Sequence, residues 1–116
     1  MGIHGEPGVK REKLKPANDI ADALVDPILA DLSLPRGSKV TVLVNSLGAT
    51  PVEELFILFN RIADRLEAEG ITIAHPLVGR YATSMEMAGA SLTVLPLDDE
   101  LEGYLTTPAS CAFWTV

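Results

Sequence analysis

An imidazole in an open glycine setting is the group best suited to chemistry in this sequence. His4 lies between Gly2 and Gly5, and the sequence Glu-Pro-Gly follows at 6–8. Glycine has no Cβ, so a ligand can approach this ring closely, and the proline-glycine pair fits a type II turn. If the stretch is extended, Glu6 projects to the same side as His4 and can orient the ring. At a pKa of about 6.5 most of the ring is neutral, so it can act as a nucleophile toward the carbonyl carbon of a small ketone.

Each candidate group also has a plainer interpretation. Chain ends are commonly mobile, which makes a disordered terminal residue the alternative for His4. His75 has no cysteine or second histidine at ligand spacing, so we interpret it as a structural or interface residue. Ser84 lies in a hydroxyl-rich loop, but no base beside it would activate a nucleophile. The acids at 98–100 suit a helix start better than a divalent ion. The sequence therefore predicts no metal site.

The hydrophobic spacing in the first half predicts a helix, a strand and a second helix. The first helix follows Pro16 and runs to Leu32, and Pro27 inside it predicts a kink or two shorter helices. Residues 39–45 are rich in β-branched side chains, which is typical of a central strand covered on both faces. For the second helix we expect Thr50 as N-cap, with Pro51 at the first helical position and Glu53 completing a capping box, and an end at Gly70.

The second half predicts two further strands and a short helix. Residues 71–78 complete a β-α-β crossover with parallel strands, and Pro76 beside His75 suggests a strand end, a bulge or a sheet edge. Residues 89–97 form a third strand candidate, and a short helix opens at 98–100. The aromatics of the tail, Phe113 and Trp114, would dock the tail or meet another subunit. We therefore expect residues 1–116 to form a single three-layer α/β domain with a mixed, partly parallel sheet flanked by helices.

The loop at 46–49 joins a predicted strand to a predicted helix, the usual ligand position in α/β proteins. Free amides at a helix start can hold a phosphate. However, Glu53 and Glu54 in the first turn would repel an anion, and the loop lacks the lysine of a phosphate cradle. We therefore favour a structural or subunit-contact role, and the sequence predicts no cofactor or nucleotide site.

Composition narrows the choice of partners. The net charge of −7 argues against binding nucleic acid or an anionic membrane surface. A single cysteine, Cys111, rules out an internal disulfide and fits a reducing compartment. No signal peptide or apolar run of membrane-spanning length is present, so we expect a cytoplasmic protein.

Four segments, taken in order, resemble the dihydroxyacetone kinase family. They are Gly-Ile-His-Gly-Glu-Pro-Gly at 2–8, Asn-Ser-Leu-Gly-Ala-Thr-Pro at 45–51, Thr-Ser-Met-Glu-Met-Ala-Gly at 83–89 and Leu-Asp-Asp-Glu at 97–100. Four ordered matches are far more specific than one motif, although Ala90 stands where the family usually has a bulky aromatic. The resemblance extends to about residue 108 and corresponds to the C-terminal part of the substrate-binding subunit. The N-terminal half, which forms most of the substrate pocket, is absent from this chain.

This resemblance implies an activity for the whole enzyme and a division of labour within it. It implies that His4, with Gly5 beside it in the substrate site, forms a covalent hemiaminal with dihydroxyacetone, which is phosphorylated to dihydroxyacetone phosphate. The donor, either ATP or an ADP-bound partner rephosphorylated through the phosphotransferase system, would be held with magnesium by another domain or subunit. The implied partners are the N-terminal half of the same subunit, the nucleotide-binding subunit or domain, and a second copy in a homodimer.

Two alternatives to a kinase domain stay open from the sequence. One is a non-enzymatic ligand-sensing or regulatory relative, which would keep the fold but lack the upstream catalytic residues. The other is a structural oligomerisation domain, supported by the apolar tail. Even on the kinase interpretation, we expect this fragment alone to be inactive, because the remaining catalytic groups would lie in the missing half.

Overall fold

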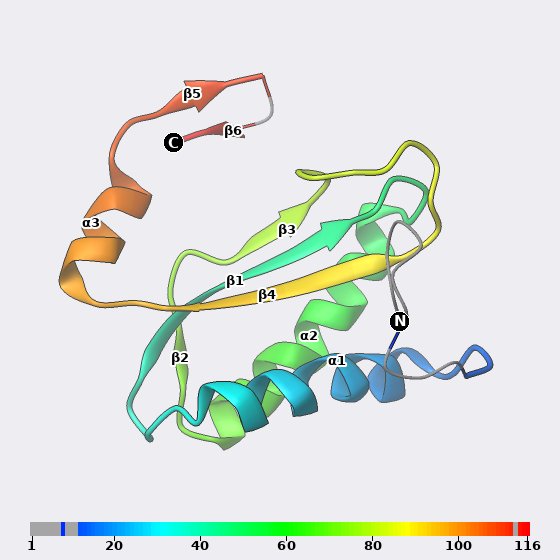
Figure 1. The fold of residues 1–116 in the computed structure, drawn as a ribbon, viewed down its shortest axis with the longest axis horizontal. Helices are drawn as coiled ribbons and strands as arrows, with labels where there is room; N and C mark the ends of the chain where they lie inside the picture. The colour runs from blue at the N-terminus through cyan, green and yellow to red at the C-terminus, as the bar shows by residue number, and fades with distance from the viewer. Residues whose placement is uncertain (1–7, 9–11, 113) are drawn as a thin grey trace.

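The elements of the fold are taken from a computed structural model, which describes residues 8, 12–112 and 114–116. In chain order they are α1 (Ala17–Leu32), β1 (Lys39–Ser46), α2 (Val52–Ala68), β2 (Thr72–Ile73), β3 (Leu77–Gly79), β4 (Ala90–Pro96), α3 (Asp99–Thr106), β5 (Ser110–Cys111) and β6 (Trp114–Thr115) (Figure 1). None of the described helices is long and apolar enough to cross a membrane.

Strand β1 is the centre of the main sheet. On one side it pairs in parallel with β2 near its start and with β3 near its end, and on the other side it pairs antiparallel with β4 along nearly its whole length. The parallel partners follow β1 through α2, which is the predicted crossover. The predicted mixed, partly parallel sheet is therefore confirmed. A separate two-stranded sheet, β5 with β6, lies near the C-terminus.

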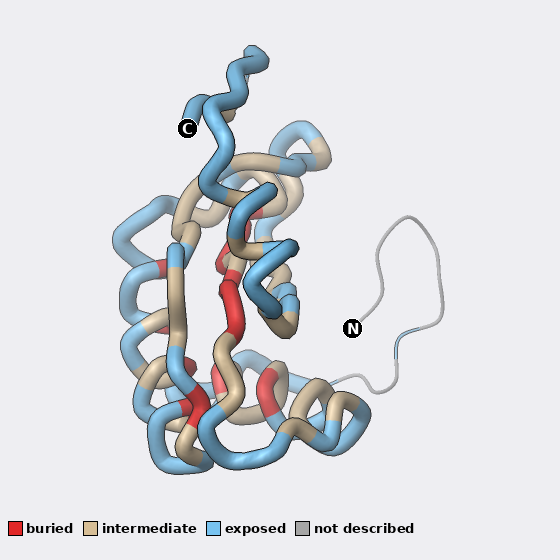
Figure 2. The backbone as a smooth tube through the Cα atoms, turned by 90° about the vertical axis from the view of Figure 1, so that its left-hand side faces the viewer, coloured by how far each residue is buried: buried red, intermediate tan, exposed pale blue. Residues whose placement is uncertain are grey.

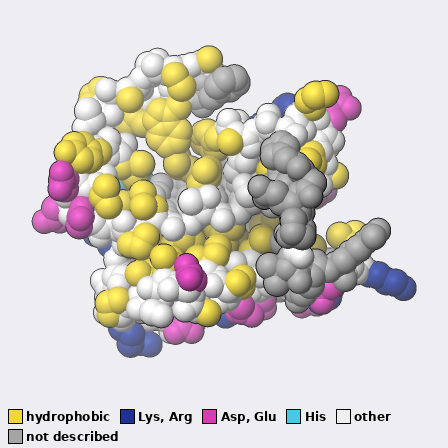
Figure 3. Space-filling model, viewed as in Figure 1, with side chains coloured by type: hydrophobic (Ala, Val, Ile, Leu, Met, Phe, Trp, Pro, Cys, Tyr) yellow, Lys and Arg dark blue, Asp and Glu magenta, His cyan; other side chains and the backbone are white. Residues whose placement is uncertain are grey.

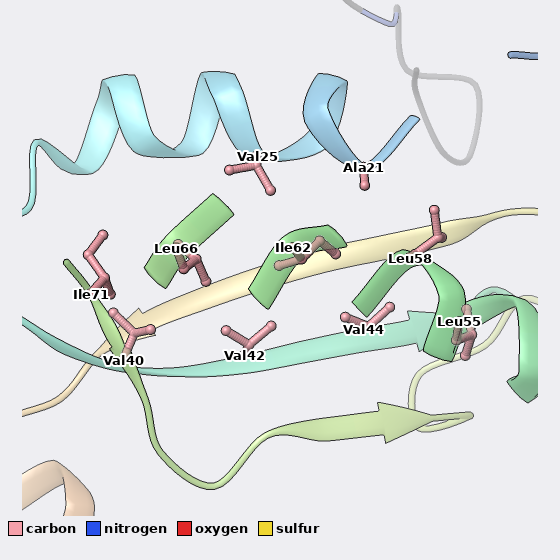
Figure 4. Packing of buried hydrophobic residues seen from close by; sticks show 10 residues of the cluster. All are labelled: Ala21, Val25, Val40, Val42, Val44, Leu55, Leu58, Ile62, Leu66 and Ile71. Carbon is pink, nitrogen blue, oxygen red and sulfur yellow. The ribbon is translucent and has the colours of Figure 1, made fainter. Parts of the chain in front are cut away.

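The main core lies between one face of β1 and the two long helices. Alternate residues of β1 point toward the inner side of α2 (Figure 4). These are Val40, Val42 and Val44, each at most 1% exposed to solvent. Helix α1 adds Ala21 and Val25 to the same cluster. Since successive side chains of a strand point to opposite faces, the period of two in β1 selects the helix-covered face.

The third layer, on the opposite face of β1, is slight. Helix α3 buries none of its residues, and Figure 2 shows the C-terminal segment that contains it as mostly exposed. Among its described side chains, Glu102 forms hydrogen bonds with the sheet region, to Lys39 on β1 and to His75 between β2 and β3. Trp114 on β6 reaches back to Tyr81, with ring centroids 5.7 Å apart. This contact agrees with the prediction that a tail aromatic docks.

Two local predictions in the first half of the chain are corrected by the structure. The predicted capping box at Thr50 is wrong: Pro51 occupies the N-cap position without a side-chain cap bond, and the Thr50 hydroxyl is used elsewhere. Of the two outcomes predicted at Pro27, two shorter helices is wrong, because α1 continues through the proline to Leu32, and the kink stays a prediction. A proline removes only one backbone bond, and burial of Val25 supports the helix through that point.

The predicted strand at 71–78 is two short strands, β2 and β3. His75 lies between them with a backbone φ of +52°, a value that residues other than glycine rarely adopt, and Pro76 follows it. The strand break expected at this pair is therefore confirmed. The predicted helix start at 98–100 is also confirmed, since the Asp98 side chain accepts a bond from the Leu101 amide and α3 begins at Asp99.

Candidate functional site

The predicted catalytic residue and its neighbour cannot be placed. His4 and Gly5 lie outside the described residues, so their roles stay predictions. The structure instead describes the scaffold around the other segments singled out in the sequence. Because β1 and β3 are parallel, their carboxyl ends meet at one edge of the sheet, and the loops 47–51 and 80–89 follow them there.

Asn45, near the end of β1, holds the second of these loops in place. Asn45 is only 2% exposed to solvent, and its Oδ1 accepts hydrogen bonds from the backbone amides of Tyr81 and Ala82, both at 2.9 Å. Its Nδ2 donates to the Ala82 carbonyl at 2.7 Å and to the Ser91 hydroxyl at 3.3 Å. A buried amide with all its bonds made fixes the loop relative to the strand.

Thr50 ties the first loop to the second. Its hydroxyl accepts from the Gly89 amide at 2.9 Å and donates to the Gly89 carbonyl at 2.8 Å. Ser46 adds a further link, since its hydroxyl donates to the Thr50 carbonyl and accepts from the Gly48 amide. The two loops are therefore one rigid unit, joined by side chains from the segment that the sequence analysis singled out at 45–51.

The two loops approach each other closely at Gly48. Its φ is +137°, and a Cβ at this position would lie 2.0 Å from the Met85 carbonyl oxygen. Met85 itself has a φ of +49°, is 83% exposed, and its carbonyl accepts a 3.4 Å bond from Arg80. The loop therefore presents an exposed apolar side chain at the edge where the parallel strands end. Such a feature suits contact with another surface better than catalysis.

The chemistry available at this edge is limited. Within the described ranges no group of three or more histidine, cysteine, aspartate or glutamate side chains could hold a metal ion. Ser84 bonds through its backbone to Leu47 and Met87, and no described base contacts its hydroxyl. The structural or contact role expected for the 46–49 loop stays a prediction, and the hydrogen bonds between this loop and the 80–89 loop support it.

A second polar cluster joins the opposite end of the sheet to α3. Glu102 accepts from Lys39 Nζ at 2.6 Å and lies 3.3 Å from His75 Nε2. The hydrogen bond from Lys39, with a smaller contribution from His75, lowers the pKa of Glu102, and the same bond raises the pKa of Lys39. The Thr41 hydroxyl donates to the His75 carbonyl, which holds the strained residue. These bonds support the structural one of the two roles, structural or interface, that the sequence predicts for His75.

A separate group of ion pairs joins helix α1 to helix α2. Asp22 on α1 accepts from both Arg61 and Arg65 on α2, and Arg65 also donates to Asp26. The hydrogen bonds from Arg61 and then Arg65 lower the pKa of Asp22 to about 2. Because these carboxylates and guanidinium groups bond one another between two helices, we interpret the cluster as structural.

Sequence reasoning missed the roles of Asn45 and Glu102, and it assigned the Thr50 hydroxyl to a helix cap instead of to Gly89. One signal for Asn45 was available, because an amide at the end of a continuous apolar strand must be buried and therefore needs partners. The partners of Thr50 and Glu102 are 39 and 63 residues away in the chain. No local pattern marks them.

Comparison with known proteins places these features in a family. A model described as the Dak1 domain matches residues 1–113. The chain is 43% identical over 116 residues to the dihydroxyacetone-binding subunit DhaK of PTS-dependent dihydroxyacetone kinase 2 from Listeria innocua, covering all of this chain and 35% of that protein. It is 47% identical over 113 residues to an L-erythrulose 1-kinase from Mycolicibacterium smegmatis, covering 93% of this chain and 20% of the relative. The chain thus spans about a third or less of the length of these relatives.

Solved structures of related proteins superpose on this chain. A structure titled as regulation of the dha operon of Lactococcus lactis superposes with a TM-score of 0.89 at 34% identity, covering 98% of this chain and 36% of that one. The dihydroxyacetone kinase from C. freundii, in complex with AMP-PNP and Mg2+, superposes with a TM-score of 0.75 at 30% identity, covering 99% and 21%. The C. freundii kinase and the structure titled as regulation of the dha operon therefore both share the fold of this chain.

Proposed function

Because the chain belongs to the Dak1 domain family, we propose that it is the substrate-anchoring part of a dihydroxyacetone kinase. The observation that carries the proposal is His4 in its Gly-Ile-His-Gly-Glu-Pro-Gly setting, inside the stretch that the family model matches. Two relatives at 43% and 47% identity are named as kinases of short ketoses, which supports a substrate of that class. Dihydroxyacetone is the substrate we propose.

In the proposed step, His4 holds the ketone covalently. The lone pair of a neutral ring nitrogen forms a bond to the carbonyl carbon while the C=O π electrons move to oxygen. The oxygen gains a proton, and the ring loses the proton of its other nitrogen, so the product is a neutral hemiaminal. Only a carbonyl compound can react in this way, which selects ketoses over polyols. The anchored substrate then presents a terminal hydroxyl for phosphoryl transfer, a reaction governed by positioning and charge stabilisation.

The phosphoryl donor lies outside this chain in our proposal. ATP, or an ADP-bound partner rephosphorylated through the phosphotransferase system, is held with magnesium by a separate domain or subunit in the cytoplasm. The rigid loop unit at the carboxyl ends of β1 and β3 is a suitable contact surface for such a partner. The rest of the substrate pocket would come from the remaining two-thirds of a subunit of the length seen in the relatives.

The covalent step is tested by following the carbonyl carbon of the substrate. The longest native polypeptide that contains the chain is mixed with dihydroxyacetone labelled with 13C at the carbonyl. We expect part of the ketone signal to move to the range of tetrahedral carbon. The adduct should vanish in His4→Ala and persist in His75→Ala, a matched control because the chain has only two histidines. An adduct that survives His4→Ala would overturn the proposal.

A regulatory role is the second candidate, and the structural comparison favours it in one respect. The operon-regulation structure superposes better than the kinase, although its identity, at 34%, is lower than that of the kinases compared by sequence. Turnover separates the two roles. A kinase phosphorylates dihydroxyacetone, or L-erythrulose, when a donor system is supplied. A sensor binds the ketose without turnover with either donor.

A further inference from the structure

The last part of the chain forms an arm that is attached to the sheet at two separate places. This C-terminal arm, residues 98–112 and 114–116, curves from the end of β4 back toward the loop that follows β3 (Figure 1). At its near end Glu102 bonds Lys39 and His75. At its far end Trp114 packs against Tyr81, with ring centroids 5.7 Å apart. The other hydrogen bonds of the described arm residues lie within the arm itself.

Little of the arm is buried. Among its described residues only Glu102, Leu105 and Trp114 are half-buried, and the others are exposed. Figure 3 shows a hollow between the arm and the sheet with hydrophobic side chains gathered along it, so the arm does not lie flat on the sheet. A segment with few buried contacts opens locally at a lower free-energy cost than the core. The near-end bonds keep Trp114 within reach of Tyr81, so that closing again is an intramolecular step.

Tyr81 belongs both to the arm contact and to the 80–89 loop. Its backbone amide donates to Asn45 Oδ1 at 2.9 Å. Its ring lies against the backbone at the end of β3, since a Cβ at Gly79 would be only 3.1 Å from it. The surface that receives Trp114 is therefore positioned by the same bonds that hold the loop.

We propose that the C-terminal arm is a strap that opens and closes at Trp114, and that its closed state and the held state of the 80–89 loop stabilise each other. Trp114 closes on Tyr81 when Asn45 holds the loop. By thermodynamic linkage, closure stabilises the held loop by the same factor as the held loop stabilises closure. A partner bound at this loop would change how often the arm opens, and this consequence alone rests on the proposed function.

The test measures amide exchange at both ends of the contact, in the longest native polypeptide that contains the chain. Trp114→Ala should speed exchange of the Tyr81 and Ala82 amides about fivefold, the effect expected for one aromatic pair, although both amides donate to Asn45 and not to the arm. Tyr104→Ala is the matched control, because this arm aromatic is 67% exposed and its hydroxyl bonds within the arm. It should leave both amides unchanged.

The reverse experiment removes the attachment of the loop. The Ala109 and Val116 amides are bonded across the β5–β6 hairpin, and a two-stranded hairpin is marginally stable alone, so they exchange when Trp114 leaves the sheet. Asn45→Ala should speed exchange of these two amides by the same factor of about five. In a Trp114→Ala background the Asn45 change should no longer affect them, because the contact that transmits it is gone.

Two results would overturn the proposal. One is a Trp114→Ala or Asn45→Ala variant in which exchange at the other end of the contact is unchanged, since the arm and the loop would then be independent. The other is wild-type exchange of the Ala109 and Val116 amides as slow as that of the β1 amides, since the arm would then open only when the whole fold unfolds. Neither result bears on ketose anchoring, which is read from the adduct at His4.

Discussion

Replacing Asn45 by alanine is the most direct test of how the loop unit at the carboxyl ends of β1 and β3 is held. The amide side chain is almost fully buried and makes four hydrogen bonds, two of them accepted from the neighbouring amides of Tyr81 and Ala82. Alanine removes all four and leaves a small void. The loop at 80–89 would then be attached chiefly through Thr50 and through backbone bonds.

The size of the effect follows from which partners water can reach. An unsatisfied buried donor or acceptor costs about 1–3 kcal/mol. Tyr81 is half-buried and Ala82 is exposed, so water replaces part of each lost bond. We therefore take the lower end for each of the two amides and add about 1 kcal/mol for the remaining bonds. The total of about 3 kcal/mol corresponds to opening of the loop about 100 times more often.

Hydrogen–deuterium exchange reads this opening directly. Amides from 80 to 89 should exchange about 100-fold faster in Asn45→Ala, up to the limit set by global unfolding, while amides of α1 and α2 keep their rates. Asn60→Ala is the matched control, because Asn60 is an exposed amide on α2. Exchange in 80–89 that is equally slow in Asn45→Ala and in the wild type would show that the backbone bonds alone hold the loop, and our account of Asn45 would be refuted.

Three further changes test separate parts of the structure. Gly48→Ala should destabilise the fold by about 2–4 kcal/mol in urea unfolding, because its Cβ would clash with the Met85 carbonyl, whereas Gly37→Ala, also at positive φ but in open space, should cost about 1 kcal/mol. The lowered pKa of Asp22 contributes stability that is present above its ordinary pKa of 3.8 and is lost as pH falls toward about 2. Asp22→Asn should therefore flatten the acid unfolding curve in that window, and an unchanged slope would contradict the ion pairs. Trp114→Ala should speed amide exchange in β5 and β6 without changing exchange in β1, because its ring contact links the tail to the body.

The sequence predicted the elements whose signal is local. The run of β-branched residues at 39–45 identified the central strand, and the apolar spacing ending at Gly70 identified α2. Asp98 was recognisable as a helix start because the acid that caps the first turn lies beside the amide it accepts from. In each case the interacting groups lie within a few residues of one another, so a single sequence contains the whole interaction.

The features that could not be predicted depend on partners distant in the chain. Thr50 has the residue type and the position of an N-cap, but a pair of bonds to Gly89 competes for the same hydroxyl. Glu102 was not singled out in the sequence, because only the fold brings Lys39 and His75 to it. Pairing between such distant groups is decided by sheet topology, which the sequence pattern predicted only as far as a parallel crossover.

The central position of β1 also determines the order in which the chain can fold. Its parallel partners β2 and β3 follow soon after α2, whereas β4 pairs with β1 only after about 40 intervening residues have been made. At a synthesis rate of roughly 5–20 residues per second, one side of β1 stays unpaired for several seconds after the strand has left the ribosome. During that interval the hydrophobic strand at 40–44 is open to wrong pairing. This stretch of the nascent chain is therefore where we expect a chaperone to bind and where slower translation would reduce the yield of folded protein.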